Sequence, residues 1–335
     1  MPTTESTTLS RRDILRVGIA GGVALTMASP ALAEAVYPIK IIEAAPRGGK
    51  PFRIAHLTDM HVTEKHRAQA GFAAALQSLE QIDPAPELLL TGGDHIMDAL
   101  VQTRERAIEQ WDMYTKILAD NTKVKAYACM GNHDVWGWSA KDADYSAHPE
   151  FGKPIALERL GMTDRYYSFD AGGWHFVMLD NIQPRGKGYF ATLDAEQHAW
   201  LEKDLAKNMS GERLPALVVT HIPLCAIASM FFGKGGENGQ EFYRVNDNLM
   251  HHDAKPLIRL LANNNVKLAL SGHTHLLDRV DYLGVSFICD GAISGNWWGG
   301  PYQDFQEGYG LFDLYPNGAF EHRYVDYGWK SVKEA

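Results

Sequence analysis

Five short apolar runs in this chain each end in residues that can bind metal ions. The last run, residues 266–271, is followed by Gly272-His273-Thr274-His275. At the C-terminal end of a strand, two histidines one residue apart can direct both imidazoles to one point, and imidazole is a common ligand of transition metals. A histidine pair in a loop is also a common solvated feature, so this motif alone indicates little. The interpretation as a metal site becomes strong because four earlier apolar runs end in the same type of residue.

The four earlier runs supply the remaining donors. Residues 52–57 precede Asp59 and His61, residues 87–91 precede Gly92-Gly93-Asp94, residues 124–130 precede Asn132 and His133, and residues 216–220 precede His221. The paired glycines before Asp94 allow a tight turn beside a ligand. Every donor is an oxygen or an imidazole nitrogen and none is a thiolate, which favours Zn, Fe or Mn over a cysteine-type zinc site.

Helix-like segments separate these runs. Alanines, leucines and aromatic residues recur at helical spacing in residues 66–82 and 102–118, and further helices are expected over residues 193–205 and 255–263. Residues 166–170 and 174–180 indicate an antiparallel hairpin that opens a second sheet. The alternation predicts an α/β fold, a sandwich of two sheets flanked by helices, in which ligands gather where the strands end.

The N-terminus predicts a targeting segment. Ser10-Arg11-Arg12-Asp13-Ile14-Leu15 is a twin-arginine pattern, and Pro30-Ala31-Leu32-Ala33 supplies a small-residue cleavage site. The apolar run between them has about 11 residues, fewer than the roughly 18 that a transmembrane anchor needs. We therefore expect a signal peptide over residues 1–33 and an N-terminal arm over residues 34–50. The chain would meet the twin-arginine export machinery, reach the periplasm or the medium, and keep no stable membrane insertion after cleavage.

Composition limits the remaining possibilities. The 335 residues are 45% hydrophobic and 22% charged, which suits a globular chain. We expect a single domain over residues 51–335 with insertions near residues 135–165 and 225–255. The net charge of −9 argues against a nucleic-acid polymer as partner, and an acidic protein that handles phosphate needs local positive charge, which metal ions supply. Three cysteines make no disulfide framework; buried thiols are expected, although one pair could be bridged.

The complete set of motifs resembles a known family. Asp59-x-His61, Gly93-Asp94, Gly131-Asn132-His133-Asp134, His221 and Gly272-His273-Thr274-His275 follow the motif order of the calcineurin-like metallophosphoesterases across residues 53–276. The resemblance implies a four-layer αββα sandwich with two divalent or trivalent metal ions, Fe, Mn or Zn. It implies that one ion binds Asp59, His61, Asp94 and His275, and that the other binds Asp94, Asn132, His221 and His273.

The same resemblance implies a reaction. Two neighbouring cations acidify a bridging water, so that a bridging hydroxide attacks a phosphate ester. His133 matches the family's histidine that contacts the phosphoryl group or protonates the leaving oxygen. The expected substrate is a small phosphate ester whose identity the sequence leaves open.

Two differences from the motifs of known branches limit which branch of the family this chain resembles. The protein phosphatases typically carry Gly-Asp-x-x-Asp-Arg, whereas here the second acid is displaced to Asp98 and the arginine is missing. The purple acid phosphatases use a metal-binding tyrosine where this chain has Met97. Both facts weaken the protein-phosphatase and purple-acid-phosphatase interpretations. The Asn132-His133-Asp134 form and the overall layout look more like the bacterial phosphodiesterase branch, so a phosphodiesterase is favoured. The alternatives are a phosphomonoesterase of the same fold and a non-catalytic exported protein that binds a metal or another ligand.

Four further residues have two interpretations each. His95 either contacts substrate or orients a ligand, and Asp134 is expected to orient rather than to bind metal. Trp297 and Trp298 lie in a glycine-rich loop. They either form an aromatic wall beside the metals or fill the core between the sheets.

Overall fold

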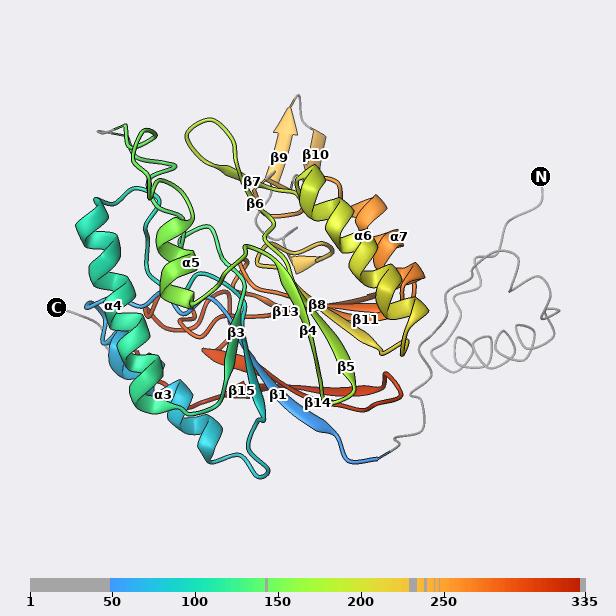
Figure 1. The fold of residues 1–335 in the computed structure, drawn as a ribbon. Helices are drawn as coiled ribbons and strands as arrows, with labels where there is room; N and C mark the ends of the chain where they lie inside the picture. The colour runs from blue at the N-terminus through green and yellow to red at the C-terminus, as the bar shows by residue number, and fades with distance from the viewer. Residues whose placement is uncertain are drawn as a thin grey trace, which may run out of the picture. The chain divides into compact units, whose positions relative to one another are not determined.

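The computed structural model describes residues 49–331, apart from residues 142–143, 229–233, 238–239, 244 and 247. The expected signal peptide, and the expected N-terminal arm except for its last two residues, lie outside the described residues, so both stay predictions. Two sheets lie face to face, with helices on the outer side of each (Figure 1). The predicted α/β sandwich of two sheets flanked by helices is confirmed.

The first sheet contains the strands that precede three of the motifs. Its order is β15-β14-β1-β2-β3, and β1 (Phe52–Leu57), β2 (Leu88–Thr91) and β3 (Ala126–Ala128) run parallel. Two antiparallel strands, β14 (Gly308–Leu314) and β15 (Phe320–Asp326), extend the sheet beyond β1. The crossovers run through α3 (Ala68–Glu80) and α4 (Arg104–Asn121) on the outer face. Because β1, β2 and β3 are parallel, the residues that follow them meet at one edge.

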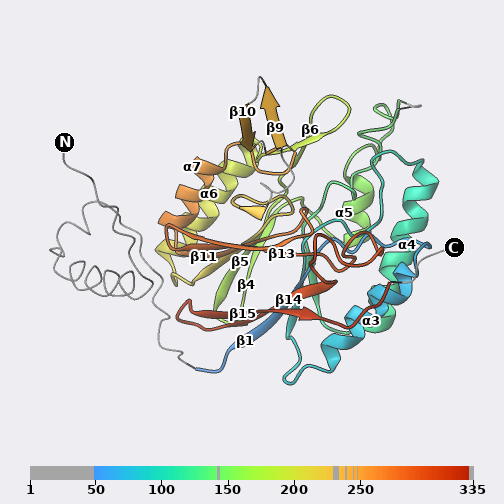
Figure 2. The same cartoon turned by 180° about the vertical axis from the view of Figure 1, so that it is seen from behind.

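The second sheet brings the other motifs to that edge. Its order is β12-β13-β11-β8-β5-β4. The bounds are β4 (Tyr167–Ala171), β5 (Trp174–Met178), β8 (Ala216–Val219), β11 (Val266–Ser271), β12 (Leu277–Tyr282) and β13 (Val285–Asp290). Strands β5, β8, β11 and β13 are parallel. The helices α6 (Ala195–Ser210) and α7 (Ala254–Asn263) cover the outer face, as the view from behind also shows (Figure 2).

Smaller elements lie in the connections. They are the hairpins β6 (Ile182–Pro184) with β7 (Tyr189–Ala191) and β9 (Lys234–Glu237) with β10 (Gln240–Tyr243), and the helix α5 (Pro154–Leu160). The insertion expected near residues 135–165 contains α5. Pro154 in its first turn and Gly161 in the left-handed conformation after its end mark its limits.

Apolar side chains fill three layers. Leu57, Phe72 and Trp111 lie between the first sheet and its helices, Ile54, Trp174 and Phe312 lie between the sheets, and Val218, Leu201 and Leu261 lie under α6 and α7. Sheets buried on both faces explain the continuous apolar runs in the sequence. Cys129 and Cys289 are buried, Cys225 is half-buried, and all three are free thiols. In the part of the chain that the structure describes, no helix has the length and apolar character needed to cross a membrane.

His175 in β5 joins β4 to α6. Its Nδ1 lies 2.6 Å from Asp170 Oδ1, and its Nε2 lies 2.8 Å from Asp204 Oδ2. Burial alone would lower the pKa of His175, but the hydrogen bonds to Asp204 and Asp170 raise that pKa overall. A raised folded-state pKa gives stability that is complete below the unfolded pKa of about 6.5 and is lost as the pH rises through the folded value.

We expect His175→Gln to lower the free energy of unfolding by about 1 kcal/mol at pH 6, since it removes partly exposed ion pairs, and by less at pH 9. Urea denaturation at both pH values measures the difference. His198→Gln on α6, which removes a single contact 3.5 Å from Glu202, is the control and should change stability little. An equal loss at both pH values in the His175 variant would contradict the assignment.

Candidate metal centre

The side chains of the five motifs lie together at the edge where parallel strands of both sheets end. Asp59 and His61 follow β1, Asp94 follows β2, Asn132 follows β3, His221 follows β8, and His273 and His275 follow β11. All of these residues except the half-buried His273 are buried. Segments up to 216 residues apart in the sequence therefore contribute to one cluster.

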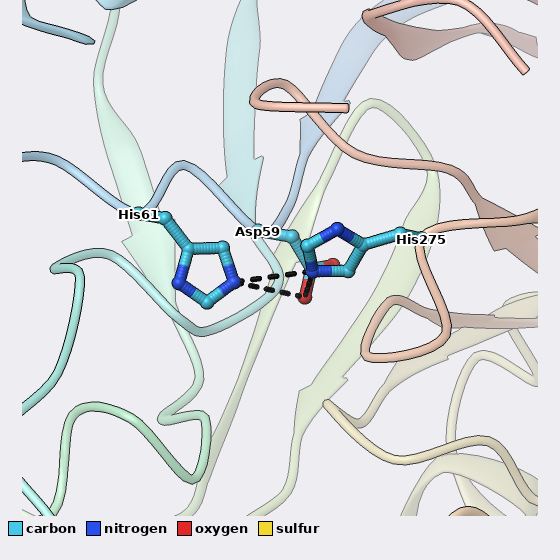
Figure 3. Close-up of side chains that lie close together, drawn as sticks. All are labelled: Asp59, His61 and His275. Atoms are coloured by element: carbon cyan, nitrogen blue, oxygen red, sulfur yellow. Dashed lines mark hydrogen bonds and ion pairs between the residues drawn. The ribbon is translucent and has the colours of Figure 1, made fainter. Parts of the chain in front are cut away.

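The first group of donors is Asp59, His61 and His275 (Figure 3). His275 Nε2 lies 3.3 Å from Asp59 Oδ1 and 3.1 Å from His61 Nε2. Donor atoms of all three residues lie within 4.8 Å of one another. This separation suits three ligands of one ion.

The second group of donors is Asp94, His221 and His273. His221 Nε2 lies 3.2 Å from Asp94 Oδ2 and 3.1 Å from Asn132 Oδ1, so Asn132 joins this group. The same Asp94 Oδ2 is 3.6 Å from His61 Nε2 in the first group. Asp94 therefore lies between the two groups and can serve both.

Backbone carbonyls determine which ring nitrogen carries the hydrogen in three of the histidines. Nδ1 of His221 and of His275 donate to Gly92 O at 2.8 Å and to Gly295 O at 2.6 Å, and His273 Nε2 donates to Asn248 O at 2.9 Å. A carbonyl oxygen can only accept, so in each neutral ring the other nitrogen presents a lone pair. In His221 and His275 that nitrogen faces a carboxylate. A cation between this nitrogen and the carboxylate would be bound by the lone pair and by the negative charge, so this donor set fits a metal ion.

The pKa values show the same need for positive charge. Burial would lower the pKa of His221, but Asp94 raises it to about 9. Burial would raise the pKa of Asp94, but His221 and His133 hold it well below its usual value. Burial lowers the pKa of His61 to about 3 and that of His273 to about 4, which keeps both imidazoles neutral at pH 7, as metal ligands must be.

The backbone is strained at the ligands. Asp59, His61, Asp94, His273 and His275 have φ of 55°, 43°, 52°, 69° and 58°. Residues other than glycine rarely adopt positive φ, and such strain gathers at functional sites where the surroundings enforce it. These conformations could not be predicted from the sequence, because the residues are not glycines.

Asp134 fastens two of the ligand loops together. Its carboxylate accepts hydrogen bonds from the backbone N–H groups of Asp94, His95 and Gly131 at 3.0, 2.9 and 2.8 Å. The His95 ring lies 2.9 Å from Asp134 and 2.8 Å from Thr91 Oγ1, and it is fully buried. This burial favours the orienting interpretation of His95 over contact with substrate.

His133 lies beside the two groups, and its side chain is 28% exposed. Its backbone N–H donates to Asp94 Oδ1 at 2.8 Å, and its ring meets the His61 ring edge-on at 4.9 Å. Asp98 Oδ1 lies 3.7 Å from His133 Nδ1. In the sequence, Asp98 stands out only as a displaced acid. The available signal was a carboxylate four residues after Asp94, in a turn that could bring it back to the site.

Trp297 and Trp298 have different surroundings. Trp298 is fully buried, and its Nε1 donates to the carbonyls of Met60 and His61 at 3.1 and 3.0 Å. Trp297 is 37% exposed, and its ring lies 4.4 Å from the ring of His275. Trp298 therefore packs in the core, but between the first sheet and its helices rather than between the sheets, and Trp297 lies beside the donor groups.

Comparison with known proteins gives a consistent picture. The family model for calcineurin-like phosphoesterases matches residues 52–277. A 3',5'-cyclic-nucleotide phosphodiesterase of Nostoc is 27% identical over 71% of this chain and 79% of its own length. Purple acid phosphatase 23 of Arabidopsis thaliana is 28% identical over 53% of this chain and 34% of its own length. A dimetal phosphatase of Danio rerio has a similar fold, with a TM-score of 0.58 at 15% identity, over 84% of this chain and 100% of that one.

Gly131 tests the packing of the ligand loops. A Cβ at this position would lie 2.1 Å from Asp94 Oδ1 and 2.3 Å from Asp94 N. Because supporting contacts typically change metal affinity 10- to 100-fold, we expect Gly131→Ala to lower metal affinity by about tenfold or more. Elemental analysis after loading and dialysis measures this. Gly188→Ala is the control, since its nearest neighbouring atom would be 3.7 Å away, and equal metal content in both variants would contradict the packing argument.

Proposed function

The chain belongs to the calcineurin-like phosphoesterases, and from this membership we propose that it is a phosphodiesterase that hydrolyses a small phosphate diester at a pair of metal ions. The family and the relatives indicate a metal-dependent phosphoesterase as the general class. The observation that carries the proposal is a pair of adjacent donor groups in which Asp94 Oδ2 lies 3.2 Å from His221 Nε2 in its own group and 3.6 Å from His61 Nε2 in the other.

We propose two ligand sets for the metals. One ion binds Asp59, His61, Asp94 and His275, and the other binds Asp94, Asn132, His221 and His273. When bound, two such ions supply positive charge to the phosphoryl oxygens and lower the pKa of a water molecule. Fe, Mn and Zn all suit these oxygen and imidazole donors.

His133 would act on the leaving oxygen. Its Nδ1 is buried and lies 3.7 Å from the Asp98 carboxylate, which leaves Nε2 as the nitrogen that can reach a substrate. The carboxylate would stabilise the charged imidazole and hold the ring in place, so that His133 donates a proton as the ester bond breaks. Asp134 would act indirectly, by positioning the loops that carry Asp94 and His133.

Two facts support a diester over a monoester. The match to the cyclic-nucleotide phosphodiesterase covers 79% of that protein, whereas the match to the purple acid phosphatase covers 34% of that one. Met97 also stands where the purple acid phosphatases place a metal-binding tyrosine. The other candidates are a phosphomonoesterase and a non-catalytic binding protein.

Hydrolysis assays of the metal-loaded protein separate these functions. We expect a larger kcat/KM for bis-p-nitrophenyl phosphate than for p-nitrophenyl phosphate. The reverse order would indicate a monoesterase. Loss of metal in Asp94→Asn together with no turnover of any ester by the wild type would indicate a binding protein.

The role of His133 predicts a dependence on the leaving group. We expect His133→Ala to retain metal and to lose about 100-fold or more in kcat for a phenyl ester, which needs a proton on its leaving oxygen. The loss should be smaller for the p-nitrophenyl ester, because p-nitrophenolate leaves without help. His198→Ala, another partly exposed histidine, is the control. An equal loss for both esters would show that His133 does not protonate the leaving group.

A further inference from the structure

A cavity of about 410 Å³ lies next to the metal centre. Its lining comes from the segment after β1, the loop after β2, the first turns of α4, and Trp297; it includes Thr63, Glu64, Met97, Asp98, Arg106 and Trp297. Two of these residues connect it to the metal centre: Asp98 approaches His133, and Trp297 packs against His275. A group attached to a phosphate at the metals could therefore extend into the cavity, whose volume suits a small ligand.

Most of the charged side chains that line this cavity already form ion pairs or hydrogen bonds within the protein. Arg106 pairs with Glu64 and also with Glu109 at 3.0 Å. Asp98 accepts a hydrogen bond from the backbone N–H of Leu100 at 2.8 Å. Lys65, the other lysine or arginine in the lining, is exposed to solvent. An uncharged organic group fits this balance better than a second phosphate, which would have to compete with the carboxylates for Arg106.

Trp297 lies at the boundary between the cavity and the metal centre, next to an anchored residue. Its backbone has a φ of 46°, and the next residue, Trp298, is anchored by its buried ring and by a hydrogen bond from its N–H to Ser294 O at 2.7 Å. The rings of His275 and Tyr302 lie 4.4 and 5.7 Å from the Trp297 ring. The indole nevertheless stays 37% exposed. A partly exposed indole offers a ready surface to another ring.

We propose that Trp297 is a specificity-determining residue, and that the cavity binds an aromatic or heterocyclic ring in the organic part of the phosphoester, of the size of a nucleobase. The proposal rests on the proposed function, because the phosphoryl group must bind at the metals for the ring to reach the cavity. Stacking of a ring on an aromatic side chain is worth about 1–3 kcal/mol and tolerates different ring types.

Phenylphosphonate and methylphosphonate test this proposal. Both carry a phosphonate group, and a phenyl ring in the first replaces the methyl group of the second. Calorimetry on the metal-loaded protein should give about tenfold tighter binding of phenylphosphonate. We expect Trp297→Leu to abolish this preference while the affinity for methylphosphonate stays within about twofold. Trp297→Phe should keep most of the preference. Tyr282→Leu, which changes an exposed ring on β12, should change neither affinity.

Three outcomes would overturn the proposal. The first is a wild type that binds both phosphonates equally, or binds neither. The second is a Trp297→Leu variant in which both affinities fall together, because the indole would then only support His275. The third is a Trp297→Phe variant that behaves like Trp297→Leu. If the ring preference is present but no ester is hydrolysed, the proposed function fails and the ring-binding role of Trp297 stands.

Discussion

Two buried carboxylates, those of Asp59 and Asp94, impose the constraint on which the rest of this edge depends. Burying a charge is costly unless an opposite charge lies close to it. Here the ionisable groups beside them are imidazoles, and backbone carbonyls accept from Nδ1 of His221 and of His275, so that the Nε2 of each ring faces a carboxylate. Cations bound between the imidazoles and the carboxylates would balance the negative charge. Such binding also explains why strained backbone conformations are kept at five of the ligands.

Residues around the donors hold them in place. Asp134 ties the Asp94 loop to the Gly131 loop, and Trp298 supports the backbone of His61 from the core side. These contacts are made by groups that would touch neither metal nor substrate, so they act through the ligands. A dimetal phosphatase at only 15% identity has a similar fold. Sites built on a common fold usually differ in their loops, and the proposed role of Trp297 would be of this kind.

The sequence was sufficient to predict the sandwich and the grouping of the motifs, because each donor comes shortly after a parallel strand and such strands end at one edge. It was not sufficient for contacts made across loops. Asp98 reaches His133 through a turn that no periodicity describes, and the carbonyls of Gly295 and Asn248 carry no residue-specific signal. Trp297 and Trp298 are identical in type and adjacent, and only the packing of Trp298 against the helix at Gly71 separates them.

The central claim is that seven side chains hold two ions that share Asp94. A crystal structure of the metal-loaded protein, with anomalous diffraction recorded at the absorption edge of the metal, tests it most directly. The account predicts two adjacent anomalous peaks, one contacted by Asp59, His61 and His275, the other by Asn132, His221 and His273, with Asp94 touching both. A single peak, or peaks away from Asp94, would contradict it.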